Sequence, residues 1–278
     1  MMRERARVLV TVKAQPALSQ KHGEVVCVAG IRLDGDRPEW IRLFPVPFRD
    51  LEKVVKFKKY QVMEVDIVRP RSDARPESHT PNMDSATLGE VVDTRPGGSW
   101  RRRWDILSGL ADLHTMCELN RGQREGRPMP SLAMVRPAKV LDVEVDDTPD
   151  FSEAQKAMAL MAAEADLFGE AREPLEAPPF TVRYRWQCLD DDCAGNHRQT
   201  CVDWEVGGAA RRWLREHDHE TVRRMLRDKW LGELCGPQRD TYFFVGNQHL
   251  HQQSYLILGV FWPPHDPGRL EPQLTLLD

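Results

Sequence analysis

The segment CLDDDCAGNHRQTCVDWE, residues 188–205, places three cysteines, one histidine and five carboxylates within eighteen positions. Cys188, Cys193, His197 and Cys201 follow the spacing C-x4-C-x3-H-x3-C. Structural zinc is commonly held by tetrahedral sets of this composition, with two to five residues between neighbouring ligands. We therefore predict a structural Zn²⁺ site formed by these four residues. The alternative is a polar loop whose cysteines and histidine are unrelated.

The spacing resembles that of a zinc knuckle, C-x2-C-x4-H-x4-C, over fourteen residues. Its first gap is two residues longer here, so the resemblance extends to the metal chemistry and not to a partner. Four protein ligands close the coordination shell, which is typical of structural rather than catalytic zinc. Asp190, Asp191 and Asp192 are expected to solvate the loop.

The compartment is inferred from the cysteines and from the N-terminal segment. The chain has six cysteines, three of them in this cluster, and such clustering favours metal over disulfides in a reducing compartment. Cys27 and Cys117 lie in apolar segments and are interpreted as core residues. The segment MMRERARVLVTVKA lacks the apolar core of a signal peptide, and no apolar run is long enough to span a membrane. We predict a cytoplasmic protein.

The predicted fold class is α+β. Short runs rich in Val, Ile and aromatic residues between positions 6 and 68 predict a β-rich, barrel-like N-terminal part, with a hairpin at Asp34 and Gly35. Helical periodicity predicts helices over 99–119, 203–216 and 219–232, and Ser152 with Gln155 predicts a capping box that opens another. Residues 252–262 are expected to form a terminal hairpin with 239–247.

The domain boundary is predicted in EAREPLEAPP, residues 170–179, which has prolines and no periodicity. This divides the chain into a β-rich domain, 1–169, and a zinc-containing domain, 180–278.

Nucleic acid is the predicted partner, although the net charge of −4 excludes an overall basic surface. Arginine binds phosphates through two parallel hydrogen bonds and stacks on bases, so basic patches interleaved with tryptophan suit nucleic acid. Neighbouring carboxylates allow the alternative of a solvated, salt-bridged helical surface. The predicted binding residues are Lys56, Lys58, Lys59, Arg101, Arg102, Arg103, Arg211, Arg212, Arg215, Arg223, Arg224 and Arg227.

Two further functions remain open. The first is a nucleic-acid-processing enzyme, a nuclease or base-releasing hydrolase, because histidines and carboxylates suit acid–base or metal-assisted chemistry. Its candidate catalytic residues are His249, His251, Asp66, Asp73, Glu77, Asp203 and Glu205. The second is a protein-interaction module in which tryptophans form a docking surface. The sequence lacks GxxxxGK[ST], GxGxxG after a strand, GxSxG and HExxH, which disfavours nucleotide-driven motors, Rossmann enzymes, α/β-hydrolases and zincins.

Overall fold

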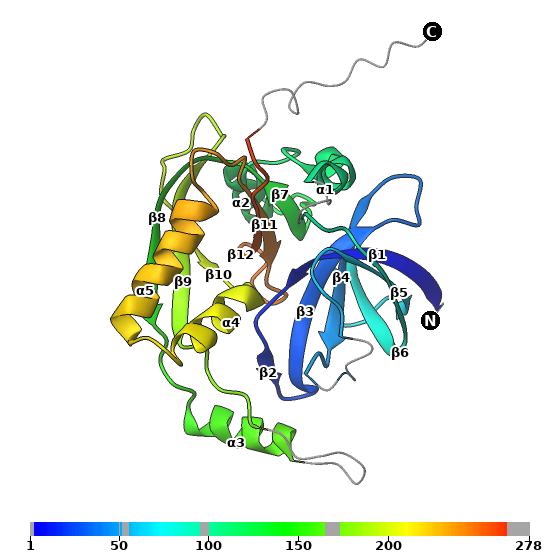
Figure 1. The fold of residues 1–278 in the computed structure, drawn as a ribbon. Coiled ribbons are helices and arrows are strands. Elements are labelled where there is room, and N and C mark those ends of the chain that lie inside the picture. The colour runs from blue at the N-terminus through cyan, green and yellow to red at the C-terminus, as the bar shows by residue number, and fades with distance from the viewer. Residues whose placement is uncertain (1–2, 50, 52–55, 95–99, 165–172, 266–278) are drawn as a thin grey trace.

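The structure is a computed structural model that describes residues 3–49, 51, 56–94, 100–164 and 173–265. Its described part is mixed α+β, with two six-stranded sheets and five α-helices. The two sheets lie beside each other in Figure 1. None of the described helices is long and apolar enough to cross a membrane.

The first sheet contains the N-terminal strands in the order β1-β5-β6-β4-β3-β2, and β1 also pairs with β3. Its strands are β1 (Glu4–Lys13), β2 (Ala17–Ser19), β3 (Gly23–Arg32), β4 (Glu39–Val46), β5 (Gln61–Val68) and β6 (Ser78–Val91). Strands β4 and β6 are parallel, whereas the other pairs are antiparallel. Alternating side chains of β1 explain its burial on both faces: Val8 and Val10 enter the core of this sheet, and Leu9 packs toward the second sheet.

The second sheet has the order β7-β11-β12-β10-β9-β8. Its strands are β7 (Leu132–Val135), β8 (Pro137–Asp147), β9 (Phe180–Cys188), β10 (His197–Cys201), β11 (Tyr242–Asn247) and β12 (Tyr255–Phe261). Strands β11 and β12 form the predicted terminal hairpin. Strands β7 and β8 precede residues 170–179 in the sequence and pair with strands that follow them. This sheet therefore draws strands from both sides of the predicted linker, of which residues 170–172 lie outside the described part.

The helices agree with the predicted pattern except in one region. They are α1 (Trp100–Leu107), α2 (Met116–Arg124), α3 (Glu153–Ala163), α4 (Trp204–Trp213) and α5 (His219–Arg227), with a short 3₁₀ helix, η2 (Ser108–Leu110), and a π-helix, η3 (Asp228–Glu233). The capping box of Ser152 and Gln155 is confirmed, and Asp218 caps α5 by accepting from the backbone N–H of Thr221. The prediction of a single helix over 99–119 was wrong. The helical segment ends after η2, Asp112 has φ +56°, and a new helix, α2, begins after its cap Thr115.

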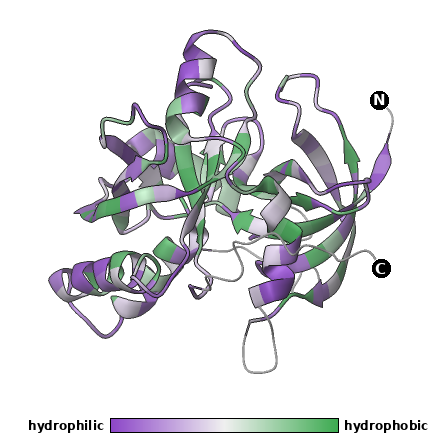
Figure 2. Cartoon of the chain, turned by 90° about the horizontal axis from the view of Figure 1, so that it is seen from above, coloured by the Kyte–Doolittle hydropathy of each residue, from purple (hydrophilic) through white to green (hydrophobic). Residues whose placement is uncertain are grey.

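Apolar packing joins the two sheets. Leu9, Ile31 and Tyr60 of the N-terminal part share one buried cluster with Phe244 and Phe261 of the second sheet. Trp100 and Trp104 pack on this cluster through the ring of Phe261. Figure 2 shows many hydrophobic residues on the central strands and mixed hydrophilic and hydrophobic residues along the helices. The tryptophans that flank Arg101, Arg102 and Arg103 are therefore packing residues.

Candidate metal centre and adjoining groove

A cluster of three cysteines and one histidine forms where α2 meets the loop between β9 and β10. Cys117, Cys188, Cys193 and His197 each offer one ligand atom, and these atoms all lie within 4.8 Å of one another. Nε2 of His197 is 3.5 Å from Sγ of Cys117, 3.4 Å from Sγ of Cys193 and 3.3 Å from Sγ of Cys188. Such a group can hold a metal ion.

The distances suit tetrahedral coordination. With Zn–S near 2.3 Å and Zn–N near 2.0–2.1 Å, neighbouring sulfur and nitrogen ligands of a tetrahedron are about 3.5 Å apart. The three measured separations between His197 and the thiols span 3.3 to 3.5 Å. The indole of Trp186 packs 4.8 Å from the imidazole of His197, centroid to centroid, and limits its rotation.

Cys117 takes the place that the sequence assigned to Cys201. It lies in the first turn of α2, where Thr115 caps the helix by accepting a hydrogen bond from the backbone N–H of Glu118 at 3.1 Å. Burial, followed by the neighbouring Cys188 and Cys193 thiols, raises the pKa of the Cys117 thiol to about 12 without a metal, and the thiolate is the form that binds metal, so metal binding there releases a proton. Sequence reasoning assigned Cys117 to the core, because no local spacing relates it to a cluster 71 or more residues away.

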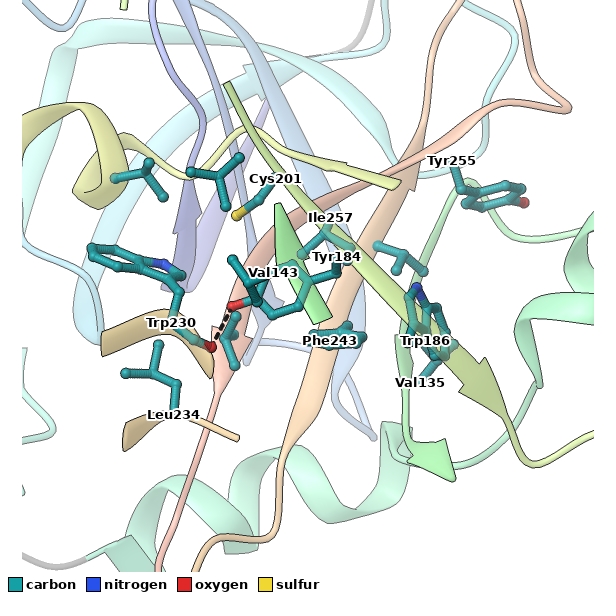
Figure 3. Packing of buried hydrophobic residues seen from close by; sticks show 14 of the residues in the cluster. Val135, Val143, Tyr184, Trp186, Cys201, Trp230, Leu234, Phe243, Tyr255 and Ile257 are labelled. Atoms are coloured by element: carbon teal, nitrogen blue, oxygen red, sulfur yellow. Dashed lines mark hydrogen bonds between the residues drawn. The ribbon is translucent and has the colours of Figure 1, made fainter. Parts of the chain in front are cut away.

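Cys201 is a core residue. It is 2% exposed, and burial raises the pKa of its thiol to about 12. Figure 3 shows it in the apolar cluster that contains Tyr184, Trp230 and Ile257. Cys201 and His197 are the two ends of β10, which separates their Cα atoms by about 13 Å at the usual rise per residue. The prediction that Cys201 completes the set is corrected to Cys117.

Asp190 holds the cysteine loop against α2. Its Oδ2 accepts hydrogen bonds from the Thr115 hydroxyl at 3.0 Å and from Arg121 at 3.1 Å. Its Oδ1 accepts one from the backbone N–H of Asp192 at 3.1 Å. The Thr115 hydrogen bond, together with Arg121, holds the pKa of Asp190 below its usual value. Asp190 is therefore a structural anchor rather than a group that only solvates the loop.

A groove of about 820 Å³ adjoins the cluster. Strands β10 and β12 pair at Cys201 and Ile257. The N-terminal ends of these strands, at His197 and Tyr255, line the groove together with α2. Cys117, Asn120, Arg121 and Arg124 recur at helical spacing and present one face of α2 to it, while Met116 and Leu119 are buried on the other face. The remaining lining residues include Glu125, Asn196, Arg198, Gln199, Gln253 and Ser254.

Most of the predicted basic residues on helices have partners within the chain. Arg223 pairs with Asp147 and Glu220, and Arg227 pairs with Asp142. Arg211 donates to the carbonyl oxygens of Glu176 and Ala177, and Arg224 donates to the Thr221 hydroxyl. Arg212 lies near the ring of Trp213. Arg212, Arg215 and Arg224 are exposed on α4, α5 and the turn between them.

The remaining basic candidates lie near α1 and the start of β5. Arg101 pairs with Asp105 and Arg102 with Glu90, both on the surface. Arg103 stacks 3.6 Å above the ring centroid of Tyr60 and donates to the carbonyl oxygen of Val92. Arg103 is thus half-buried, burial lowers its pKa, and its Nε is engaged by the backbone, which are the contacts of a packing residue. Lys56 and Lys58 are exposed.

Lys59 is buried in an ion-pair network, which corrects its predicted exposure to a ligand. Its Nζ lies 2.6 Å from Oδ2 of Asp203 and 3.0 Å from Oε2 of Glu205. Burial acts to lower the pKa of Lys59, but Asp203 and Glu205 more than offset it and raise that pKa. Asp203 also caps α4 through the backbone N–H of Glu205. Both acidic residues, predicted as catalytic candidates, are thus committed to Lys59.

The other catalytic candidates are divided between two places. Asp66 pairs with Arg5 at 3.2 Å on the first sheet. Asp73 meets His249, with Nδ1 3.3 Å from Oδ1, and binds Arg75 through both of its oxygens. Burial alone would raise the pKa of Asp73, but the Arg75 guanidinium holds it well below its usual range.

Glu77 is engaged in structure, since its oxygens accept from the backbone N–H and hydroxyl of Ser131 at 2.8 and 2.7 Å. His251 is exposed in the loop between β11 and β12. Of the seven candidates, the structure therefore brings Asp73 and His249 together, and Asp203 and Glu205 around Lys59.

Comparisons with solved structures find weak similarities. One chain of the structure described as "Structure and Conformational Change of a Replication Protein A Heterotrimer Bound to ssDNA" is 9% identical, with 97% of this chain and 51% of that chain covered and a TM-score of 0.34. This chain thus spans about half the length of that one. A chain described under "Structural mimicry for functional antagonism" is 9% identical, with 94% and 92% covered and a TM-score of 0.27.

No curated protein matches the chain. Two families match it one after the other. The family described as Domain of unknown function (DUF8758) matches residues 4–109, which hold the first sheet and α1. The second matches residues 112–278, which hold α2, the second sheet and the Cys/His cluster. Because this second match covers more than half of the sequence, the chain belongs to the family described as Domain of unknown function (DUF8757).

Proposed function

We propose that this protein binds nucleic acid in the groove beside the Cys/His cluster, and that a structural Zn²⁺ held by Cys117, Cys188, Cys193 and His197 stabilises that groove. One observation carries the proposal: the groove combines guanidinium groups with neutral hydrogen-bonding side chains along one face of α2. This pairing of groups suits a phosphate backbone together with base or sugar edges.

The guanidinium groups of the groove are available to phosphates. Arg124 is exposed and makes no ion pair with any residue in the described part of the chain. Arg121 and Arg198 pair with Asp190 and Glu144, and both arginine side chains are about half exposed. Each guanidinium has five N–H donors, so its exposed edge can bind a phosphate while the contact with the carboxylate is kept. Arginine is also well suited to bidentate phosphate recognition.

Zinc is the metal that the donor set favours. Three thiolates and one imidazole at tetrahedral separations are a common set for structural zinc, whereas Mg²⁺ and Ca²⁺ require oxygen ligands. The ion would join Cys117 on α2 to His197 on β10, and residues of both elements line the groove. Binding of the metal and the shape of the nucleic-acid site are coupled in this proposal.

The first sheet adds a second argument. We infer that the pairings β1-β3, β3-β4, β4-β6, β6-β5 and β5-β1 close it into a five-stranded barrel. Small five-stranded barrels of the OB type bind oligonucleotides in several protein families. Because a fold does not fix a function, the groove and not the barrel carries the proposal.

The test is fluorescence anisotropy of labelled single-stranded and duplex DNA and RNA, titrated with the zinc-loaded protein between 50 and 200 mM salt. We expect binding that weakens steeply with salt, because each phosphate contact releases condensed counterions. Absence of binding to all four probes at 50 mM salt would overturn the proposed function.

A further inference from the structure

A second cavity, of about 370 Å³, lies next to the groove. It is bounded by the segment between β5 and β6, by the chain that leads from α2 into β7, and by the loop after β11. Apolar side chains form part of its wall, and neutral amides face it from three directions. The apolar residues are Pro76, Pro128, Met129 and Pro130, and the amides are Gln123, Asn247 and Gln252.

Tyr255 forms the partition between the groove and this cavity. Its ring belongs to the groove, and its hydroxyl donates to the carbonyl oxygen of Pro130 at 2.6 Å and accepts from Nε2 of Gln123 at 3.4 Å. Gln123 and Pro130 line the cavity. Gln252 lines the cavity and the next residue, Gln253, lines the groove. A nucleic-acid strand bound along the groove therefore passes the cavity at the loop position where Gln253 and Gln252 adjoin.

Asn247 has a poorly satisfied donor beside this cavity. The residue is 3% exposed, and its Nδ2 makes no hydrogen bond of good geometry among the described residues, although its side chain lies near the Tyr255 hydroxyl, whose pKa burial raises and Asn247 acts to lower. Its backbone is fixed, since its N–H donates to the carbonyl oxygen of Ser131 at 3.0 Å and its carbonyl oxygen accepts from Arg75 at 2.8 Å. A buried donor without an acceptor is unfavourable, so such a group in a folded protein requires an explanation.

The charged residues of the cavity are engaged elsewhere. Arg75 binds Asp73 and Asn247, and both oxygens of Glu77 accept from Ser131. Arg127 is exposed and pairs with Glu125. The hydrogen-bonding groups left for a ligand are therefore mainly neutral amides between proline and methionine side chains. This chemistry suits a flat heterocycle with donors and acceptors on its edge, and it does not suit a phosphate.

We propose that this cavity binds one unpaired nucleobase of the strand that lies in the groove, with Nδ2 of Asn247 donating to an acceptor on the base edge. Amide side chains are common partners of base edges, and enzymes and binding proteins that take a base out of its stack hold it in a pocket of this kind. The inference rests on the proposed function, since it assigns the base-recognition part of the same site.

The experiment compares a single-stranded oligonucleotide with a fully abasic strand of the same length and phosphate number, both measured by anisotropy. We expect the base-containing strand to bind about tenfold or more tightly than the abasic strand, as for one well-made hydrogen bond with its packing. Asn247→Asp retains the Oδ1 that faces Arg75 and removes the donor, so it should lower this ratio several-fold while the affinity for the abasic strand is retained. Asn247→Ala should act in the same direction.

Gln248→Ala is the matched control, because Gln248 is an exposed amide that lines neither the groove nor the cavity. In this variant the affinity ratio of the two strands should equal that of the unaltered protein. Near-equal affinities of the unaltered protein for the two strands would overturn the base pocket and leave the groove proposal intact. A ratio that persists in Asn247→Asp would do the same. Failure of both strands to bind would overturn the proposed function together with the pocket.

Discussion

Nε2 of His197 lies 3.5 Å from Sγ of Cys117, a residue eighty positions earlier in the sequence. This contact ties the first turn of α2 to β10, and both residues line the groove. The Cys/His cluster is therefore assembled by tertiary structure and not by one loop. A metal bound there stabilises the folded chain, because the unfolded chain does not hold the fourth ligand near the other three.

Removal of the fourth ligand should remove the metal. We predict about one zinc per chain in the purified protein and a large loss of zinc in Cys117→Ser. Cys201→Ala should retain zinc, because the Cys201 thiol is buried in the apolar core and is not part of the cluster. Elemental analysis of the three proteins after gel filtration measures this directly.

Cys235→Ala provides the control for loss of a partly buried thiol outside the cluster, and it should also retain zinc. A chelator should lower the thermal midpoint of the unaltered protein, of Cys201→Ala and of Cys235→Ala. Retention of zinc in Cys117→Ser combined with its loss in Cys201→Ala would restore the contiguous set expected from the spacing.

The buried pair of Lys59 and Asp203 should contribute strongly to stability. Their side chains are 10% and 4% exposed, and removal of one partner leaves an uncompensated buried charge. We predict that Lys59→Met lowers the free energy of unfolding by about 3–5 kcal/mol. Arg102→Met, which removes the exposed partner of Glu90, should cost about 0–1 kcal/mol. Denaturant unfolding of both variants compares them, and equal small costs would show that the pair is not buried in solution.

Lys13 should make stability depend on pH in the alkaline range. Burial, followed by repulsion from Lys59, lowers its pKa from 10.5 to about 8. Below pH 8 Lys13 is charged in both the folded and the unfolded state. Between pH 8 and 10.5 the unfolded chain binds more protons than the folded chain, so the contribution of Lys13 to the free energy of unfolding rises with pH. The unfavourable contribution is largest at neutral pH and disappears above 10.5.

Lys13→Met isolates this effect from the cysteines that titrate in the same range. We predict that the variant's stability relative to the unaltered protein falls by up to about 3 kcal/mol between pH 7 and pH 10.5. Urea titrations at four pH values measure the difference. A difference that is constant with pH would show that the Lys13 pKa is not lowered by folding.

Gly30 should be intolerant of any side chain. A Cβ at this position would collide with the carbonyl oxygen of Leu9 on the neighbouring β1, where β1 and β3 pair. We predict that Gly30→Ala destabilises the protein by about 1–3 kcal/mol or more. Gly109→Ala, where a Cβ meets no atom within 4 Å, should be neutral or stabilising by up to about 1 kcal/mol. Thermal unfolding of the two variants tests the close approach of β1 to β3.

Local patterns predicted the elements that depend on neighbouring residues. The strands of the N-terminal part follow from their β-branched and aromatic content, and α3 and α5 follow from the caps Ser152 and Asp218. The helix predicted over 99–119 failed because tryptophan periodicity continues past a point where the backbone turns at Asp112. The spacing of apolar residues carries no information about a change of backbone direction at a single residue.

The candidate site was predictable only where its residues are close in sequence. Cys188, Cys193 and His197 share one loop, and their spacing identified them. Packing between distant segments determines the position of Cys117. It also places Asp203 beside Lys59, which is 144 residues earlier in the sequence. The basic run around Lys59 gave a local signal of charge, while its burial against Asp203 is a tertiary property.

The salt dependence of single-strand binding, measured in two double variants, tests whether nucleic acid lies in the groove. Arg124→Ala/Arg198→Ala removes two groove arginines, and Arg224→Ala/Arg227→Ala removes two arginines of α5. The account predicts that the groove variant reduces the slope of log K against log salt by about 1.4, the value for two phosphate contacts on a single strand, and that the α5 variant leaves it unchanged. An unchanged slope in the groove variant with a reduced slope in the α5 variant would contradict the account and place the nucleic acid on the helices.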